Sequence, residues 1–224
     1  AKFAEGKELP ETIDIDGVQR STKGSTGRRL GRTEEEVRNF WRWLGDSKVV
    51  DEAGNPLVVY HGTNAGGEVF SVFKNPKAED LGGDWNMFSE SPQYSSQFAQ
   101  AQGAHMLPVA LSIQNPLDLS SLPPRRGDAR NELISKLRSL DFDVDGLHRS
   151  IPYERDLYQI INRKGFREDL VSASKDKGYD GIKMPDSFDE NGEDIISVTW
   201  IPFSPTQIKS ATGNRGTFDP TNPD

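Results

Sequence analysis

A histidine, a glycine and a hydroxyl residue follow one another at the end of a short apolar run, and this is where chemistry is first expected. The run is VVY at residues 58–60, and His61, Gly62 and Thr63 come directly after it. A histidine ring titrates near neutral pH, so a histidine at the end of a strand is a candidate acid or base. The alternative is a turn histidine whose ring is satisfied by hydrogen bonds.

The composition argues against several other kinds of site. The 224 residues include no cysteine, so there is no disulfide, no thiolate nucleophile and no cysteine-based metal site. The three histidines, His61, His105 and His148, are too scattered to form a helix-spaced metal pair, and we expect no metal. Neither GxGxxG nor GxxxxGK occurs, which disfavours a doubly wound dinucleotide-binding fold.

The charge distribution singles out one basic stretch in an acidic chain. A net charge of -8 argues against a general electrostatic grip on nucleic acid, although not against a local one. Residues 20–32 hold five basic residues and no acidic one. This stretch is either a flexible tether or a contact for RNA or DNA.

No apolar run approaches the ~18 residues of a membrane span, and the N-terminal residues lack the apolar core of a signal peptide. We therefore expect no membrane contact and a cytoplasmic location. The chain begins at Ala1 and stops without an obvious cap, so we also expect a piece of a longer polypeptide.

Helix and turn signals predict how the first half of the chain positions His61. Thr33 and Glu36 form a capping box that opens a helix, and Gly45 ends it. Apolar residues recur on this helix at helical spacing, and Trp41 and Trp43 are interpreted as packing residues rather than as a ligand platform. A turn at residues 51–56 predicts a hairpin that delivers His61 at its exit.

The second half of the chain mixes helices and strands without a regular βαβ period. Ser91 and Pro92 predict a helix start, and this helix is expected to run to about Gln102. Residues 107–113, 179–184 and 195–203 are predicted strands, residues 185–194 a charged loop between the last two, and apolar residues within 133–178 mark three further helices. We predict an α+β fold, with residues 1–32 as a polar N-terminal arm and residues 33–224 as one domain.

Three segments, in order and spacing, resemble the ADP-ribosyltransferase superfamily in its branch with a histidine first motif. They are VVYHGT at 58–63, MFSESPQYSSQFA at 87–99 and FSPTQIKSATGN at 203–214. The chain looks most like the ADP-ribosyltransferase domains of phage, prophage and polymorphic-toxin proteins. The resemblance implies two small antiparallel sheets that face one another, with flanking helices and an NAD cleft between them.

The resemblance also implies roles for single residues. His61 matches the histidine that bonds the adenosine-side ribose, and the Gly62 backbone lies where the family grips the nicotinamide carboxamide. Ser95 matches the serine that also binds the carboxamide. Phe98 matches the aromatic residue that stacks on nicotinamide, with packing of the helix face as its alternative role.

Other residues of the same segments depart from the pattern or complete it. Met87 stands where the family has a tyrosine, and its thioether can pack against a ring but cannot replace a phenol's hydrogen bond. Thr63 and Phe88 belong to the segments that carry the cofactor-binding residues, and we count both among the candidates for NAD binding.

Thr199 occupies the position of the family's catalytic glutamate, eight residues before Gln207. A threonine carries no charge with which to stabilise a cationic transition state. Three explanations stay open: the acceptor supplies a carboxylate, a loop carboxylate reaches the site, or NAD is bound without turnover. The candidates for the second explanation are Glu190, Glu193 and Asp194.

The expected function is a mono-ADP-ribosyltransferase that moves one ADP-ribose from NAD to a macromolecular acceptor and releases nicotinamide. His61, Met87 and Thr199 would form its catalytic positions. The acceptor, protein or nucleic acid, cannot be read from the chain. The resemblance implies a phage- or toxin-associated effector in a bacterial host cell, delivered by a phage or a secretion system and, if a toxin, neutralised by a partner. The alternative is an inactive NAD-binding or structural phage module.

Overall fold

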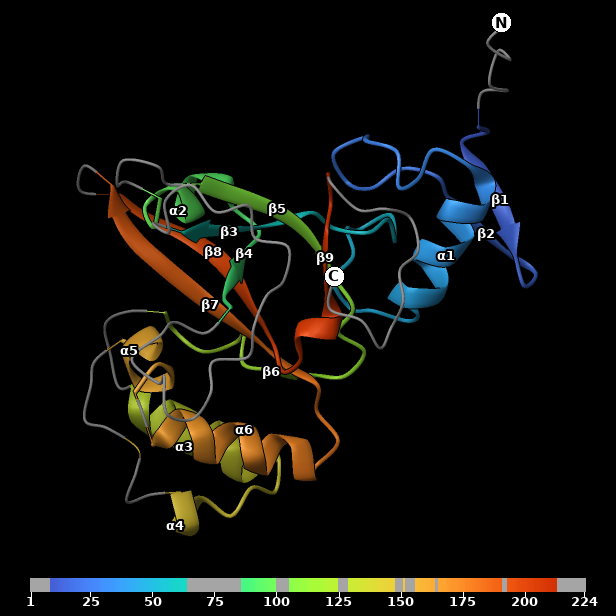
Figure 1. Ribbon diagram of the computed structural model, residues 1–224. Coiled ribbons are helices and arrows are strands. Elements are labelled where there is room, and N and C mark those ends of the chain that lie inside the picture. Colours follow the sequence, from blue (N-terminus) through green and yellow to red (C-terminus); the bar gives the residue numbers. More distant parts are fainter. Residues whose placement is uncertain are drawn as a thin grey trace, which may run out of the picture.

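The computed structural model describes residues 9–63, 86–99, 105–124, 129–147, 151, 156–163, 165–190 and 193–212. Two sheets and six α-helices fall within these ranges. Figure 1 shows a small N-terminal unit on one side of a larger body that contains the main sheet and most of the helices. The candidate site residues all belong to the larger body.

The N-terminal unit is a hairpin packed on a helix. Strands β1 (Thr12–Ile15) and β2 (Val18–Ser21) pair antiparallel, and Ile13 and Ile15 are buried against the apolar face of α1 (Glu34–Leu44). The indole nitrogen of Trp41 on this face donates to Ser21 O at 2.8 Å. Residues 9–32 are therefore attached to α1 along much of their length, while the domain boundary at residue 33 stays a prediction.

The predicted boundaries of α1 are confirmed. The Thr33 side chain accepts from Glu36 N at 3.2 Å, and Gly45 ends the helix with a positive φ of 60°. The Glu36 carboxylate accepts from Arg32 N at 2.6 Å, so it satisfies a backbone donor just outside the helix. Trp41 and Trp43 are both buried, in line with their interpretation as packing residues.

The main sheet has the strand order β6-β7-β8-β4-β3-β5-β9, and all pairs except β6 with β7 are antiparallel. Its strands are β3 (Val59–Thr63), β4 (Phe88–Ser89), β5 (His105–Leu111), β6 (Pro116–Asp118), β7 (Gly181–Glu190), β8 (Glu193–Pro202) and β9 (Ile208–Ser210). The predicted α+β class is confirmed. The expected two sheets are two halves of one sheet, β6-β7-β8 and β3-β5-β9, which the two-residue strand β4 joins.

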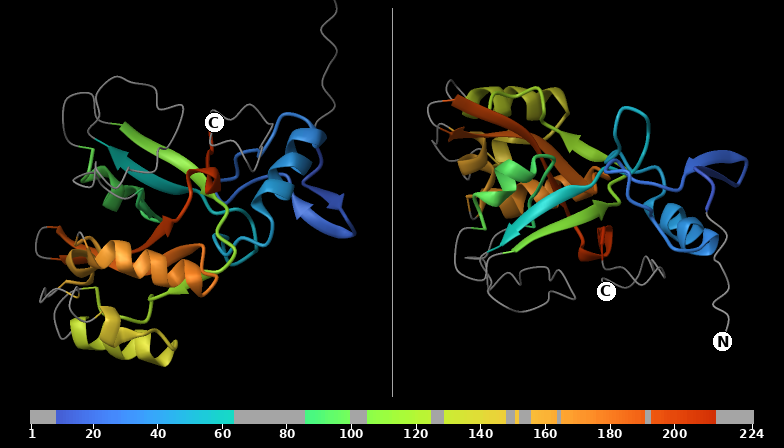
Figure 2. Two further views of the ribbon diagram at one scale, coloured as in Figure 1. Left: turned by 60° about the horizontal axis from the view of Figure 1, so that its bottom comes forward. Right: turned by 90° about the horizontal axis from the view of Figure 1, so that it is seen from above.

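Helices cover one face of the β6-β7-β8 half (Figures 1 and 2). They are α3 (Ala129–Ser139), α4 (Val144–Leu147), α5 (Leu157–Ile161) and α6 (Phe166–Asp176), while α2 (Pro92–Ser96) lies near β3. Their buried side chains share one apolar cluster with Ile182, Met184 and Ile201 of the strands. No helix in the described part of the chain combines the length and apolar character that crossing a bilayer requires.

Three local predictions were wrong. Residues 185–190 and 193–194 belong to the long hairpin of β7 with β8 instead of a charged loop, and Asp186 and Phe188 lie buried against Tyr94 of α2. Helix α2 ends at Ser96 rather than near Gln102, which lies outside the described residues; beyond Ser96 the backbone bonds tighten to three-residue turns. His61 lies in the middle of β3, not at a strand exit.

Candidate active site

Gly62 of β3 lies directly against the end of α2. A Cβ added at Gly62 would lie 2.0 Å from Ser95 O and 3.0 Å from Phe98 Cβ. Real Cβ atoms do not approach a carbonyl oxygen so closely, so only glycine fits while strand and helix keep this contact. The backbone of β3 is thereby brought next to the two residues matched to nicotinamide binding.

Ser95 fixes the position of α2 over the strand. The residue is 2% exposed, and its hydroxyl donates to Tyr60 O at 2.8 Å. The Ser91 side chain caps the helix by accepting from Tyr94 N at 3.2 Å. Because a hydroxyl oxygen has two lone pairs, Ser95 Oγ keeps acceptor capacity for a ligand amide while its proton is used on Tyr60.

Phe98 is an exposed aromatic residue beside this contact. Its side chain is 42% exposed, and its ring centroid lies 5.4 Å from that of Tyr94. A large apolar ring left open to solvent next to the Gly62 backbone can stack on a flat ligand. The role of Phe98 in stacking on nicotinamide stays a prediction.

His61 is held by the strand next to it. Its Nδ1 lies 2.9 Å from Met87 O, and because a carbonyl only accepts, Nδ1 carries the proton in this contact. The His61 ring also lies 5.4 Å from the ring of Phe88. Phe88 is fully buried in the core, so it supports His61 rather than facing a ligand, and the Met87 side chain packs against the helical cluster.

Thr199 lies on β8, paired with Ser89 of β4 on one side and Met184 of β7 on the other. It is 1% exposed, and within the part of the chain that the structure describes its Oγ1 has no hydrogen-bond partner. Its neighbour on the same strand face, Ser197, is satisfied, since its hydroxyl lies 2.6 Å from Ser89 Oγ. The position matched to the family's catalytic glutamate therefore has an uncharged hydroxyl without a hydrogen-bond partner among the described residues.

The strand register distributes the candidate residues over two faces of the sheet. Tyr60, Ser89 and Thr199 are successive cross-strand partners, so they share a face, and Gly62 shares it because side chains alternate along β3. His61 and Phe88 point to the opposite face. The structure therefore groups Gly62 and α2 with Thr199, while His61 approaches from the other side near the two-residue strand β4.

The loop carboxylates considered for the missing charge lie far from Thr199. Glu190 pairs with Glu193 at the end of the β7-β8 hairpin, next to the pair of Asp189 with Asp194. Glu193 and Thr199 are six residues apart on one strand, which corresponds to about 20 Å. No rotamer of a glutamate side chain bridges that distance, so the structure contradicts this explanation.

A nearer carboxylate was missed from the sequence. Asp186 of β7 is 4% exposed and pairs with Ser197, which puts its Cα about 7–8 Å diagonally from that of Thr199. Its carboxylate accepts from the Tyr94 hydroxyl and from Ser187 N, the latter at 2.8 Å. The spacing of Met184, Asp186 and Phe188 was the available signal, because alternation along a strand puts Asp186 on the same face as two apolar residues.

Gln207 and Asp180 have structural roles. The Gln207 side-chain amide donates to Ser112 O at 3.0 Å and to Asp180 O at 2.9 Å, and its oxygen accepts from Ser204 N at 2.8 Å. The Asp180 carboxylate accepts two backbone N–H groups of the turn that follows β5. Gln207 therefore fastens the segment between β8 and β9; the last two residues of its motif, 213–214, lie outside the described ranges.

A β-strand with a His-Gly pair, a short helix that brings a serine and an aromatic residue to that glycine, and a long antiparallel strand beside them define an α+β domain of the ADP-ribosyltransferase type. The chain belongs to the family described as ADP-ribosyltransferase in polyvalent proteins, whose model matches residues 51–218. Neither the curated proteins nor the solved structures contain a match to this chain.

Proposed function

We propose that the chain transfers a single ADP-ribose unit from NAD to a macromolecular acceptor and releases nicotinamide. Family membership supports ADP-ribosyl transfer in general. The observation that carries the specific proposal is the contact of Gly62 with α2, because it aligns a strand backbone, a buried serine and an exposed aromatic ring on one side of the sheet.

The reaction demands a leaving group that is held firmly while positive charge develops on the sugar. The bond between ribose C1′ and the nicotinamide nitrogen breaks, and its electron pair leaves with nicotinamide, which becomes neutral. A lone pair of the acceptor then bonds to C1′, and the acceptor passes its proton to a nearby base or to water. Fixing the nicotinamide orientation favours this path over diffusion of the substrate.

The proposed roles follow the placement of each group. The Gly62 backbone and Ser95 Oγ hold the carboxamide, and Phe98 stacks on the ring. His61, oriented by Met87 O, bonds the ribose, with Thr63 at the end of the same strand. Met87 packs beneath the site, and Thr199 offers a hydroxyl rather than a charge to the reacting ribose.

The negative charge missing at Thr199 is proposed to come from the acceptor. The hairpin carboxylates are too distant. Asp186 lies nearer, but its carboxylate is already bonded to Tyr94 and Ser187. A negatively charged group on the acceptor, such as a carboxylate of a protein or a phosphate of a nucleic acid, would supply the charge at the moment of transfer, which suits an enzyme that adds one unit and does not elongate it.

A second candidate function is NAD binding without turnover. The observation that favours it is again Thr199, because loss of one charged hydrogen bond worth ~3 kcal/mol in the transition state slows a reaction ~10²-fold. A sensor or a structural module of a phage particle would tolerate that loss.

Incubation of the protein with adenine-labelled NAD and a bacterial lysate separates the two functions. Transfer of label to lysate components, together with release of nicotinamide, supports the enzyme. Saturable NAD binding with neither label transfer nor nicotinamide release would instead identify a binding module.

The same assay tests Phe98. We expect Phe98→Ala to raise the KM for NAD about tenfold, since loss of stacking on one base-sized ring costs ~1–3 kcal/mol. Ile196→Ala is the matched control, because Ile196 is an exposed apolar residue of the same sheet at 67% exposure. Equal KM values for NAD in both variants would show that Phe98 does not stack on nicotinamide.

The proposal includes a cellular setting. A chain of the polyvalent-protein family is proposed to act in the cytoplasm of a bacterial host, as an effector segment delivered by a phage or a secretion system. Mass spectrometry of protein and RNA fractions from the treated lysate would identify the acceptor class directly.

A further inference from the structure

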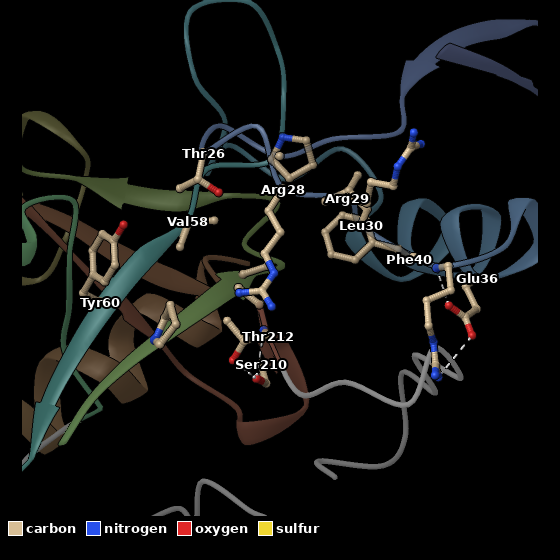
Figure 3. Close-up of a pocket in the computed structure, with 17 residues that line it drawn as sticks. Thr26, Arg28, Arg29, Leu30, Glu36, Phe40, Val58, Tyr60, Ser210 and Thr212 are labelled. Carbon is tan, nitrogen blue, oxygen red and sulfur yellow. Dashed lines mark hydrogen bonds and ion pairs between the residues drawn. The ribbon is translucent and has the colours of Figure 1, made fainter. Parts of the chain in front are cut away.

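A pocket of about 860 Å³ lies between the N-terminal unit and the β3-β5-β9 half of the sheet. Residues 24–32 form one wall, the sheet residues Val58, Tyr60, Pro108 and Ala110 form the floor, and residues 210–212 close the third side. Figure 3 shows these three parts around one space. A pocket of this volume accommodates a small-molecule-sized group.

The charge of this pocket is opposite to that of the protein. Three arginines, Arg28, Arg29 and Arg32, line it together with one acidic residue, Glu36, whereas the whole chain has a net charge of -8. The guanidinium of Arg32 lies 3.6 Å from the Glu36 carboxylate, and Arg29 donates to Leu9 O at 3.1 Å. These contacts hold two of the three arginines in place.

Arg28 is different from its neighbours. It is exposed, and its guanidinium makes no hydrogen bond or ion pair with the residues that the structure describes. Figure 3 shows its side chain pointing into the pocket toward Ser210 and Thr212. A guanidinium with hydroxyl groups opposite it matches the oxygens of a phosphate group.

The rest of the basic run is used for structure. Arg20 stacks over the Trp41 ring at 4.7 Å, and Lys23 Nζ lies 2.9 Å from the Glu11 carboxylate. The hydrogen bond and the charge of Lys23 lower the pKa of Glu11. Only the end of the run therefore faces the pocket, which makes the positive charge local rather than a general property of the N-terminal residues.

Tyr60 connects the floor of the pocket to the candidate active site. Tyr60 and Gly62 share one face of β3 by strand alternation, and Tyr60 O is the acceptor for Ser95 Oγ. Thr199 lies two strand spacings from Tyr60, about 10 Å away on that face. A group bound in the pocket thus lies within one or two nucleotide lengths of the reaction centre.

We propose that this arginine pocket binds a nucleotide of a single-stranded nucleic acid, with a phosphate on Arg28 and the base against the apolar floor, and so guides the strand to the active site as acceptor. The role of the strand as acceptor rests on the proposed transferase function, whereas its binding in the pocket does not. Nucleic acid is favoured over a phosphorylated protein because the pocket pairs the arginines with Tyr60 and an apolar floor, a combination suited to the flat faces of a base.

Fluorescence anisotropy of a labelled single-stranded octanucleotide, measured without NAD, tests the binding. We expect Arg28→Ala to weaken binding about tenfold and to reduce the salt slope by about 1, as for loss of one phosphate contact. Arg28→Lys should weaken binding less than Arg28→Ala does, because lysine keeps the positive charge but lacks the two-pronged hydrogen bonding of a guanidinium. The control is Arg138→Ala, which removes an exposed arginine from α3, whose guanidinium lies 3.6 Å from Asp145.

Three results would overturn the proposal: no binding by the wild-type chain, equal binding by the wild type and Arg28→Ala, or tighter binding of a phosphopeptide than of the strand. Competition by AMP with the affinity of the full strand would also overturn it, since the site would then serve a free nucleotide. The transfer assay is read separately. Arg28-dependent strand binding without label transfer would support the pocket and contradict the transferase function. Label transfer to protein that is unchanged in Arg28→Ala would support the transferase function and contradict the proposed role of the pocket.

Discussion

The region around Gly62 is partly exposed, the region around Thr199 is buried, and the two are held in different ways. Near Gly62, the Ser95 hydroxyl donates to Tyr60 O, His61 Nδ1 donates to Met87 O, and a Cβ at position 62 has no space. At Thr199 a buried hydroxyl has no partner within the described residues, although such a group costs about 1–3 kcal/mol. The residues proposed to hold NAD are thus fixed by hydrogen bonds and close packing, whereas the position proposed for catalysis carries no charge.

The largest expected effect comes from filling the space at Gly62. Gly62→Ala puts a Cβ into the Ser95 carbonyl and must displace α2, and a 1 Å displacement of binding groups costs roughly 10²-fold in activity. We expect at least that loss in NAD turnover. Gly146→Ala is the matched control, because its new Cβ meets only the flexible Asp143 side chain; a similar loss there would mean that the assay reports general destabilisation.

The second change adds a charge at Thr199, in the other of the two regions. Thr199→Glu is expected to raise nicotinamide release about 10- to 100-fold when no acceptor is present, since the new carboxylate can stabilise the cationic sugar. The larger side chain also overpacks a buried position and lowers stability by about 1–3 kcal/mol. Single-turnover release of nicotinamide, at a temperature where both proteins are folded, measures the effect.

Thr199→Val tests the hydroxyl alone, because it removes the hydroxyl without adding a charge. Because Oγ1 has no partner, its removal should raise the free energy of unfolding by about 1 kcal/mol, measured by urea denaturation. Nicotinamide release should fall if the hydroxyl contacts the ribose. A less stable Thr199→Val would show that the hydroxyl is paired in solution and that the two regions differ less than proposed.

A change in stability is also expected where α2 is joined to β7. Tyr94→Phe removes a hydrogen bond to the buried Asp186 carboxylate and should lower the free energy of unfolding by about 1.5–3 kcal/mol. It should also raise the KM for NAD, because α2 carries Ser95 and Phe98. Asp186→Asn keeps an acceptor for Tyr94 and should cost less; if Asp186→Asn abolishes turnover while the protein stays folded, Asp186 itself supplies the catalytic charge.

Local signals in the sequence predicted the elements that depend on local contacts. The cap at Thr33 and the stop at Gly45 gave α1 its boundaries, and the Ser91-Pro92 pair gave the start of α2. Residues 185–194 were interpreted as a loop because they are polar. Their strand is stabilised by partners about 90 residues away, such as Tyr94 for Asp186, and no local pattern encodes such a pair.

The candidate site likewise has features that the sequence predicted and features that it did not. The motif order predicted that Gly62, Ser95 and Phe98 would meet, and they do. It did not predict that His61 would lie on the opposite face from Thr199, because that depends on the register through β4. The sequence did not predict the arginine pocket either, because the pocket forms only when residues 24–32 fold back onto a sheet that begins at Val59.

Strand β4 gives the molecule a thermodynamic property that neither half of the sheet has alone. The two halves are connected through one residue pair with β3 and two with β8, compared with ten pairs between β7 and β8. A ligand that contacts both Gly62 and Thr199 bridges this weak line. If NAD binds as proposed, its binding free energy also holds the two halves of the sheet together, so NAD is expected to stabilise the fold along this line.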